Sequence, residues 1–224
     1  LAAESRGHDP VAVKNGLIRM ANLLRDRGYY RDAGDLYRNK LILERQHWPA
    51  HVDLAKALSL ESRVAPERAP ELLKESRRNL EEYLNRSESR DRIEALLLLS
   101  HLYWQQNQFQ DMEKTALLAL PDVLDTRYLG EFYLQWAKAR SRQNQVPQAL
   151  ELLPIVQDLA QSAKTMEQAT YFETELRLGE LDGRGEVLAE KLKKEDSSLM
   201  PLVYILQGKY RLETGGRDPF SMLK

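Results

Sequence analysis

Apolar residues recur along this chain at the spacing of an amphipathic helix. Leu17, Met20, Ala21 and Leu24 stand at i, i+3, i+4 and i+7, which places them on one helical face. A turn signal follows at Gly28, and a second helical face begins after it. The pattern therefore predicts two helices joined by a short turn, which together make an antiparallel hairpin.

The same plan returns twice further along the chain. One apolar helical face breaks at the polar run 105–108 and resumes at Phe109, and another breaks at the polar run 141–145 and resumes at Val146. A recurring helix pair is the sequence signature of a solenoid, in which each hairpin buries its apolar face against its neighbours. The fold class predicted is therefore all-α, and nothing in the alternation of residues indicates strands.

These units resemble the tetratricopeptide repeat, a helical hairpin of about 34 residues. Residues 14–47, 93–126 and 130–163 match the repeat in three registers without gaps. Small residues let the two helices approach closely, and an aromatic residue fills the space between hairpins. The matching residues are Leu17, Ala21, Leu24, Gly28, Tyr30, Ala33 and Tyr37 in the first unit; Leu96, Ser100, Tyr103, Asn107, Phe109, Ala116 and Ala119 in the second; and Tyr133, Ala137, Asn144, Val146, Ala149 and Leu153 in the third.

The resemblance implies a right-handed superhelix of about four or five hairpins over residues 14–214. The hairpin between residues 48 and 86 departs from the pattern, because the run 63–70 should lengthen its loop. A last helix, about Ser198 to Glu213, should begin at a Ser198 cap and close the solenoid. Residues 1–13 are expected to form a flexible segment and residues 215–224 a loose tail.

Composition narrows the range of partners. Lys and Arg (33) nearly balance Asp and Glu (34), which argues against a nucleic-acid binder or a polybasic membrane binder. The absence of Cys excludes disulfides, thiol catalysis and thiolate metal sites. No stretch approaches the roughly 20 apolar residues of a membrane-spanning helix. Because the chain opens at Leu1 rather than Met, we expect that a signal peptide, a lipidated segment or another domain preceded it.

Residues that could carry metal or acid–base chemistry are few. His47 and His51 stand four apart, but Pro49 between them is expected to start a new helix, so the two rings should not share a face. Carboxylate pairs such as Glu81 and Glu82 are expected on a solvated helix face, because no feature indicates a shared pocket. We therefore predict no metal, no cofactor and no enzymatic activity.

The tetratricopeptide resemblance also implies a concave groove lined by set positions of each first helix. Trp104 stands out there, because a large aromatic residue on an inner face is a typical interface anchor; the alternative is that it packs against the neighbouring helix. The basic clamp of the chaperone-binding subfamily is not expected, since only Asn22 fits it and Ile18, Asp53, Glu94 and Leu98 do not. The predicted partner-binding residues are Asn15, Ile18, Asn22, Arg25, Lys56, Leu97, His101, Trp104, Glu131, Lys138 and Arg142.

Two functions follow from the resemblance. The first is a scaffold that binds a peptide or helix of a partner protein, in a bacterial envelope assembly such as a pilus or secretion system. Similar proteins there are lipid-anchored and periplasmic, so a periplasmic or outer-membrane-associated location is favoured over a cytoplasmic one. The second is a partner- or ligand-sensing domain of a larger cytoplasmic regulator. Sequence preceding Leu1 would separate the two.

Overall fold

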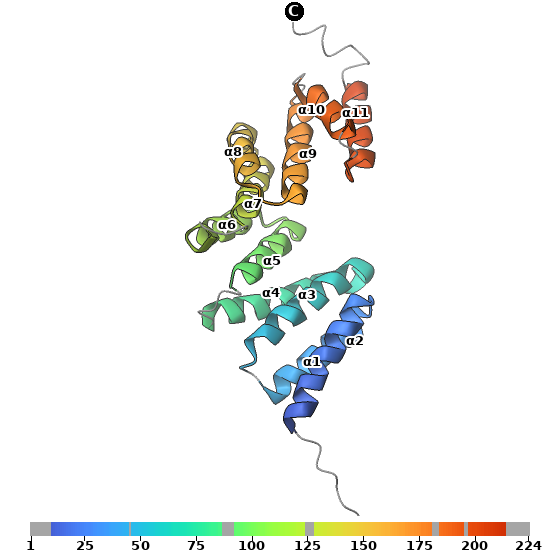
Figure 1. The fold of residues 1–224 in the computed structure, drawn as a ribbon, viewed down its shortest axis with the longest axis vertical. Coiled ribbons are helices and arrows are strands. Elements are labelled where there is room, and N and C mark those ends of the chain that lie inside the picture. The colour runs from blue at the N-terminus through green and yellow to red at the C-terminus, as the bar shows by residue number, and fades with distance from the viewer. Residues whose placement is uncertain are drawn as a thin grey trace, which may run out of the picture. The chain divides into compact units, whose positions relative to one another are not determined.

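The computed structural model describes residues 10–44, 46–86, 92–123, 128–180, 184–194 and 197–213. Over these ranges the chain forms eleven α-helices, one short 3₁₀ turn and no strand, so the all-α prediction is confirmed (Figure 1). The elements are α1 (Pro10–Asp26), α2 (Tyr30–Leu43), α3 (Trp48–Val64), η1 (Pro66–Arg68), α4 (Ala69–Arg86), α5 (Arg92–Gln105), α6 (Phe109–Val123), α7 (Leu129–Arg142), α8 (Val146–Leu159), α9 (Ala163–Gly179), α10 (Arg184–Lys194) and α11 (Met200–Glu213).

The chain divides into two compact units, Leu1–Leu102 and Tyr103–Lys224. In the first unit, α1 packs on α2, α2 on α3, and α3 on α4. In the second unit, α6 packs on α7, α7 on α8, α8 on α9, and α9 on both α10 and α11. Most of these pairs are neighbours along the chain, which is the packing of stacked hairpins. The right-handed superhelix stays a prediction.

Three of the hairpin turns share one geometry. Gly28, Asn107 and Asn144 have positive φ values of 86°, 55° and 60°. The N–H of the residue after each donates to the carbonyl five residues before that donor, at 2.9, 2.8 and 3.0 Å. This Schellman ending satisfies free helix carbonyls and favours Gly or Asn. Because these residues occupy the aligned positions of the three sequence units, the common register is confirmed.

The second hairpin has the lengthened loop that the sequence predicts. Helix α3 continues to Val64, and η1 (Pro66–Arg68) precedes α4. The buried carboxylate of Glu61 on α3 accepts a hydrogen bond from Arg68 at 2.5 Å. A buried carboxylate is costly without a cation, so this ion pair fixes the loop to the helix before it.

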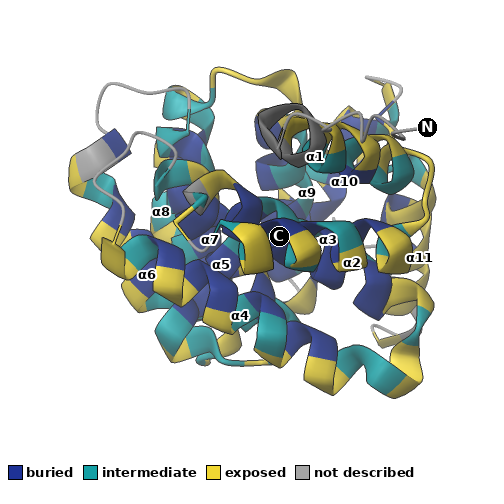
Figure 2. Cartoon of the chain, turned by 90° about the horizontal axis from the view of Figure 1, so that it is seen from below, coloured by how far each residue is buried: buried dark blue, intermediate teal, exposed yellow. Residues whose placement is uncertain are grey.

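The first unit is held together by one apolar cluster. Ala21 on α1 and Ala33 on α2 are fully buried in it, and the ring of Tyr37 lies among them. Leu54 and Leu58 of α3 belong to the same cluster, so the aromatic residue fills the space between the two hairpins, as expected. Buried residues alternate with exposed ones along the helices, as amphipathic packing requires (Figure 2).

The second unit repeats this arrangement. Ala137 on α7 and Ala149 on α8 are fully buried, and Phe172 of α9 packs in the same cluster. Helix α8 continues through Pro154, whose ring removes one backbone donor. Gly185, in the first turn of α10, lies so close to α9 that a Cβ there would be 2.9 Å from the backbone nitrogen of Leu178. No side chain larger than hydrogen fits this contact without a shift.

The C-terminal helix differs from its prediction at its start. Helix α11 begins at Met200, two residues after the predicted start near Ser198. The hydroxyl of Ser197 accepts from the N–H of Leu199 at 3.0 Å. The carboxylate of Glu167 on α9 instead accepts from the hydroxyls of Ser197 and Ser198. A side chain from a neighbouring helix therefore holds this helix start, which the local sequence could not indicate.

Helix α11 covers the end of the second unit with one side only. Val203 and Tyr210 are buried there, and buried Gln207 donates to Glu186 on α10. Tyr204 and Ile205 on its other side remain exposed. The helix therefore closes the core of α9 and α10, as the predicted capping helix should.

The predicted terminal segments lie largely outside the described residues. Helix α1 begins at Pro10, earlier than the predicted start at residue 14. The remainder of the predicted N-terminal segment, residues 1–9, and the predicted tail, residues 215–224, lie outside the described residues. Within the described ranges, every helix falls short of the length and hydrophobicity that crossing a bilayer requires.

Gly185→Ala is predicted to lower the free energy of unfolding. The new methyl group would force α9 and α10 apart at Leu178, and overpacking of this kind costs about 1–3 kcal/mol. Gly208→Ala in α11 is the matched control, because its Cβ would meet no atom within 4 Å; it should be neutral or stabilise by up to about 1 kcal/mol. Urea denaturation measures both, and equal effects would contradict the close approach.

The second unit is predicted to become less stable in acid, because it loses the stabilising contacts of the Glu167 carboxylate. Hydrogen bonds from Ser197 and Ser198 hold the pKa of the Glu167 carboxyl below its ordinary value of 4.5. A carboxyl with a depressed pKa stabilises the fold above its unfolded pKa, and this contribution is lost as the pH falls through its folded pKa. Glu167→Gln should thus lower Tm near neutral pH, and the gap from wild type should shrink below about pH 4.5.

Thermal unfolding followed by circular dichroism measures this gap at each pH. Glu151→Gln on α8 is the control, because Glu151 is exposed. A gap between wild type and Glu167→Gln that keeps its size through the acid range would show that the Glu167 carboxylate does not hold the start of α11.

Candidate partner-binding site

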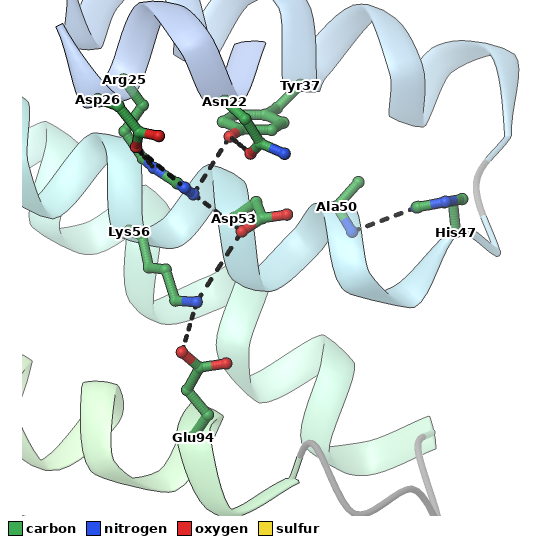
Figure 3. A network of polar contacts seen from close by, with 9 residues as sticks. All are labelled: Asn22, Arg25, Asp26, Tyr37, His47, Ala50, Asp53, Lys56 and Glu94. Carbon is green, nitrogen blue, oxygen red and sulfur yellow. Dashed lines mark hydrogen bonds and ion pairs between the residues drawn. The ribbon is translucent and has the colours of Figure 1, made fainter. Parts of the chain in front are cut away.

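Three of the predicted partner-binding residues of the first unit, Asn22, Arg25 and Lys56, belong to a polar network (Figure 3). Arg25 on α1 donates to Asp53 on α3 at 3.0 Å and to the hydroxyl oxygen of Tyr37 on α2 at 3.3 Å. The Tyr37 hydroxyl in turn donates to the side-chain oxygen of Asn22 at 2.6 Å. Burial, together with the charge of Asp53, raises the pKa of Tyr37 to about 12. These contacts join three helices across two hairpins.

The network continues to the next first helix. Lys56 on α3 forms an ion pair with Glu94 in the first turn of α5 at 2.6 Å and lies 3.9 Å from Asp53 (Figure 3). Arg25 and Lys56, two of the predicted partner-binding cations, therefore each have a carboxylate of the chain itself beside them. A partner that engaged them would first have to compete with these carboxylates.

The second unit presents a different arrangement around Trp104, at the C-terminal end of α5. The guanidinium of Arg142, at the end of α7, lies 5.0 Å from the centre of the Trp104 ring. The ring also meets Phe109 of α6 edge-on, with centres 5.6 Å apart. Trp104 is half-buried and Arg142 is exposed. A cation stacked on an indole is held in orientation while its N–H groups stay available.

Lys138 lies one helical turn before Arg142 on α7. It is half-buried, and burial lowers the pKa of its ammonium group; the charge of Glu175 on α9 opposes this shift without cancelling it. Burial and the same carboxylate raise the pKa of Tyr171 on α9. Within the described ranges, neither Lys138 nor Arg142 has a carboxylate oxygen within 4.0 Å, and neither donates a hydrogen bond. Neither cation therefore has an ion-pair partner among the described residues.

Trp136, also on α7, shows what a fully satisfied aromatic residue looks like in the same unit. Its indole N–H donates to Glu113 on α6 at 3.1 Å. Arg140 forms an ion pair with that carboxylate at 2.5 Å, and Gln143 donates to it at 2.7 Å. The indole N–H of Trp104, in contrast, has no acceptor among the described residues. Trp136 is part of the packing, whereas Trp104 retains a free donor.

The remaining predicted partner-binding residues are scattered. Asn15 and His101 are exposed, and Glu131 is half-buried in the first turn of α7. Ile18 packs against the apolar cluster of the first unit, and Leu97 is 8% exposed, so both offer little surface. Binding by each of these residues stays a prediction.

The two histidines near Pro49 have separate structural partners. The His47 ring accepts from the N–H of Ala50 at 3.3 Å and caps α3, which begins at Trp48 as the proline predicts. His51 is buried and lies 3.0 Å from the side-chain oxygen of Asn79. Among the residues that the structure describes, no three His, Asp or Glu side chains are grouped to hold a metal ion.

Sequence reasoning missed Glu175 on α9, whose charge acts on Lys138, and Tyr171, on which the same carboxylate acts. That part of the chain lies beyond the three units that match the repeat, so no inner-face positions could be assigned to it. In the structure α7 packs on α9, so the two are successive first helices of their hairpins.

Similar solved structures place the fold in a known class. No protein-family model and no curated protein matches the sequence. The chain is similar to Pseudomonas aeruginosa pilF, with 17% identity over 93% of this chain and 87% of that one, and a TM-score of 0.65. It is similar to MamA, with 14% identity over 79% and 96% of the two chains and a TM-score of 0.60. YrrB, a TPR protein with an unusual peptide-binding site, has 16% identity over 83% and 88%, and a TM-score of 0.58.

These likenesses and the three matching turns define the class. The chain has the tetratricopeptide-type helical-repeat fold, as the resemblance of its units implies. Sequence identities below one fifth support the fold but do not identify a partner. The function therefore has to be argued from the surface of this chain.

Tyr37→Phe is predicted to destabilise the first unit. The substitution retains the buried ring but removes the hydroxyl that joins Asn22 to Arg25. Losing these half-buried hydrogen bonds costs about 0.5–1.5 kcal/mol. Tyr29→Phe is the control, because Tyr29 is 57% exposed. Urea denaturation measures both variants, and an unchanged midpoint for Tyr37→Phe would mean that the network adds nothing to stability.

Proposed function

We propose that the chain is a protein-interaction scaffold, and that its second unit binds a peptide or helix of a partner protein. The observation that carries this proposal is the surface formed by Trp104, Lys138 and Arg142, which we call the α5–α7 site. Its aromatic ring is half-buried and its three donor groups have no acceptor in the described chain. Trp and Arg dominate binding energy at protein interfaces because they combine large apolar contact with directed donors.

The fold supports the same function. Stacked hairpins present a row of first helices, and peptide recognition by such repeats uses an extended surface rather than one deep pocket. The similar structure YrrB is described as having a peptide-binding site. The polar network of the first unit, in which cations and carboxylates already meet, is better suited to joining hairpins than to binding. We propose no catalytic role for the chain.

We further propose that the scaffold serves an envelope assembly such as a pilus or secretion system, with a periplasmic or outer-membrane-associated location. The likeness to Pseudomonas aeruginosa pilF over 93% of the chain supports this placement. The alternative is the sensing domain of a larger cytoplasmic regulator. Cell fractionation of the full-length protein separates the two: recovery with membranes or periplasm supports the first, and recovery with the cytosol supports the second.

The α5–α7 site is predicted to contact the partner directly. A photo-crosslinking amino acid at Ser141, between Lys138 and Arg142, should capture a partner in the native cells, whereas the same group at exposed Gln148 on α8 should not. Capture from Gln148 alone would place the interface on the second helices and contradict the proposal.

Affinity for the captured partner provides the quantitative test. Trp104→Ala should weaken binding by about tenfold or more, since anchor residues of this type contribute about 2 kcal/mol. Lys138→Glu should also weaken it, whereas Lys114→Glu on α6 should not, because Lys114 is 75% exposed and pairs only with Asp111. Equal effects of the two Lys→Glu substitutions would indicate a non-specific charge effect.

A further inference from the structure

The predicted partner-binding cations of the two units have different surroundings. In the first unit, Arg25 and Lys56 lie within hydrogen-bonding distance of Asp53 and Glu94. In the second, no described carboxylate lies within 4.0 Å of Lys138 or Arg142. The chain has almost equal numbers of acidic and basic residues, so a shortage of carboxylates does not explain the difference.

A half-buried cation without a partner is costly. Taking an ammonium group out of water disfavours its charged form, which is the cause of the lowered pKa of Lys138. The free energy of the site improves when an anion arrives, because much of the desolvation of the lysine is already present in the free protein. Glu175 attracts the ammonium from α9 but lies beyond the ion-pair distance of 4.0 Å.

We propose that Lys138 and Arg142 together bind a carboxylate of the partner protein, with an apolar neighbour of that carboxylate resting on Trp104. This inference deepens the proposed function and rests on it. The partner segment is therefore acidic, and its carboxylate comes either from an Asp or Glu side chain or from a chain terminus.

The geometry fits one carboxylate. Lys138 and Arg142 are four residues apart on α7, which brings their Cβ atoms to about 6 Å on one helical face. Stacking on Trp104 fixes the plane of the Arg142 guanidinium, and a fixed guanidinium can grip a carboxylate with two parallel hydrogen bonds.

The test is a selection of random displayed dodecapeptides on the full chain, with one library free at its C-terminus and one blocked. Peptides selected on the wild type should be enriched in Asp and Glu in both libraries if a side chain is bound, and only in the free library if a terminus is bound. On the double variant K138E/R142E the acidic enrichment should disappear, whereas K114E should retain it.

The selected acidic peptide then serves as a spectroscopic probe. It should shift the Trp104 indole N–H resonance and leave that of Trp136, which is bonded to Glu113, unchanged. Lys138→Glu or Arg142→Glu should lower the affinity for this peptide by about tenfold or more, which is the effect of losing one charge-assisted hydrogen bond. The more conservative Lys138→Gln should weaken it less.

The outcomes separate the two proposals. Peptides that bind and shift Trp104 but carry no acidic enrichment would overturn the carboxylate proposal and leave the scaffold function standing. Acidic peptides that bind K138E/R142E as well as wild type would also overturn it. If the full chain selects no peptide and the crosslinker at Ser141 captures no partner, the scaffold function itself would be contradicted.

Discussion

The close approach of paired helices at small side chains is the constraint on which this structure depends. In the first hairpin Ala21 and Ala33 are buried in one cluster. In a later hairpin Ala137 and Ala149 are fully buried in another. Larger residues there would separate the helices and displace the first helix of the next hairpin. Because every first helix is placed by the hairpin before it, the candidate binding surface depends on packing far from the surface itself.

Charge is distributed over this scaffold in two ways. The contacts of Arg25 with Asp53 and of Lys56 with Glu94 join successive first helices, so these charges serve the fold. The α5–α7 site has the same kinds of donor, but none of the described residues supplies a matching acceptor. A repeat architecture permits this, because each hairpin is stabilised chiefly by its neighbours and one hairpin can keep unsatisfied donors without loss of the whole fold.

The sequence predicted the fold well because hairpin formation is local. Helical periodicity and the turn residues Gly28, Asn107 and Asn144 are read within one repeat, and the structure confirms the register they imply. The sequence could not predict which of the partner-binding cations have a carboxylate beside them. For Lys56 and Lys138 this depends on contacts between hairpins. The contact of Glu167 with Ser197 and Ser198 at the start of α11 was beyond the sequence for the same reason, because Glu167 lies on another helix.

Hydrogen exchange of the full chain, with and without its captured partner, tests the central claim most directly. The account predicts added protection in α7 and at the C-terminal end of α5, with α6, α8 and the first unit unchanged. Protection confined to α1 and α3, or to the second helices α6 and α8, would contradict it, because the partner would then bind where the donors are already satisfied or on the opposite helices of the hairpins.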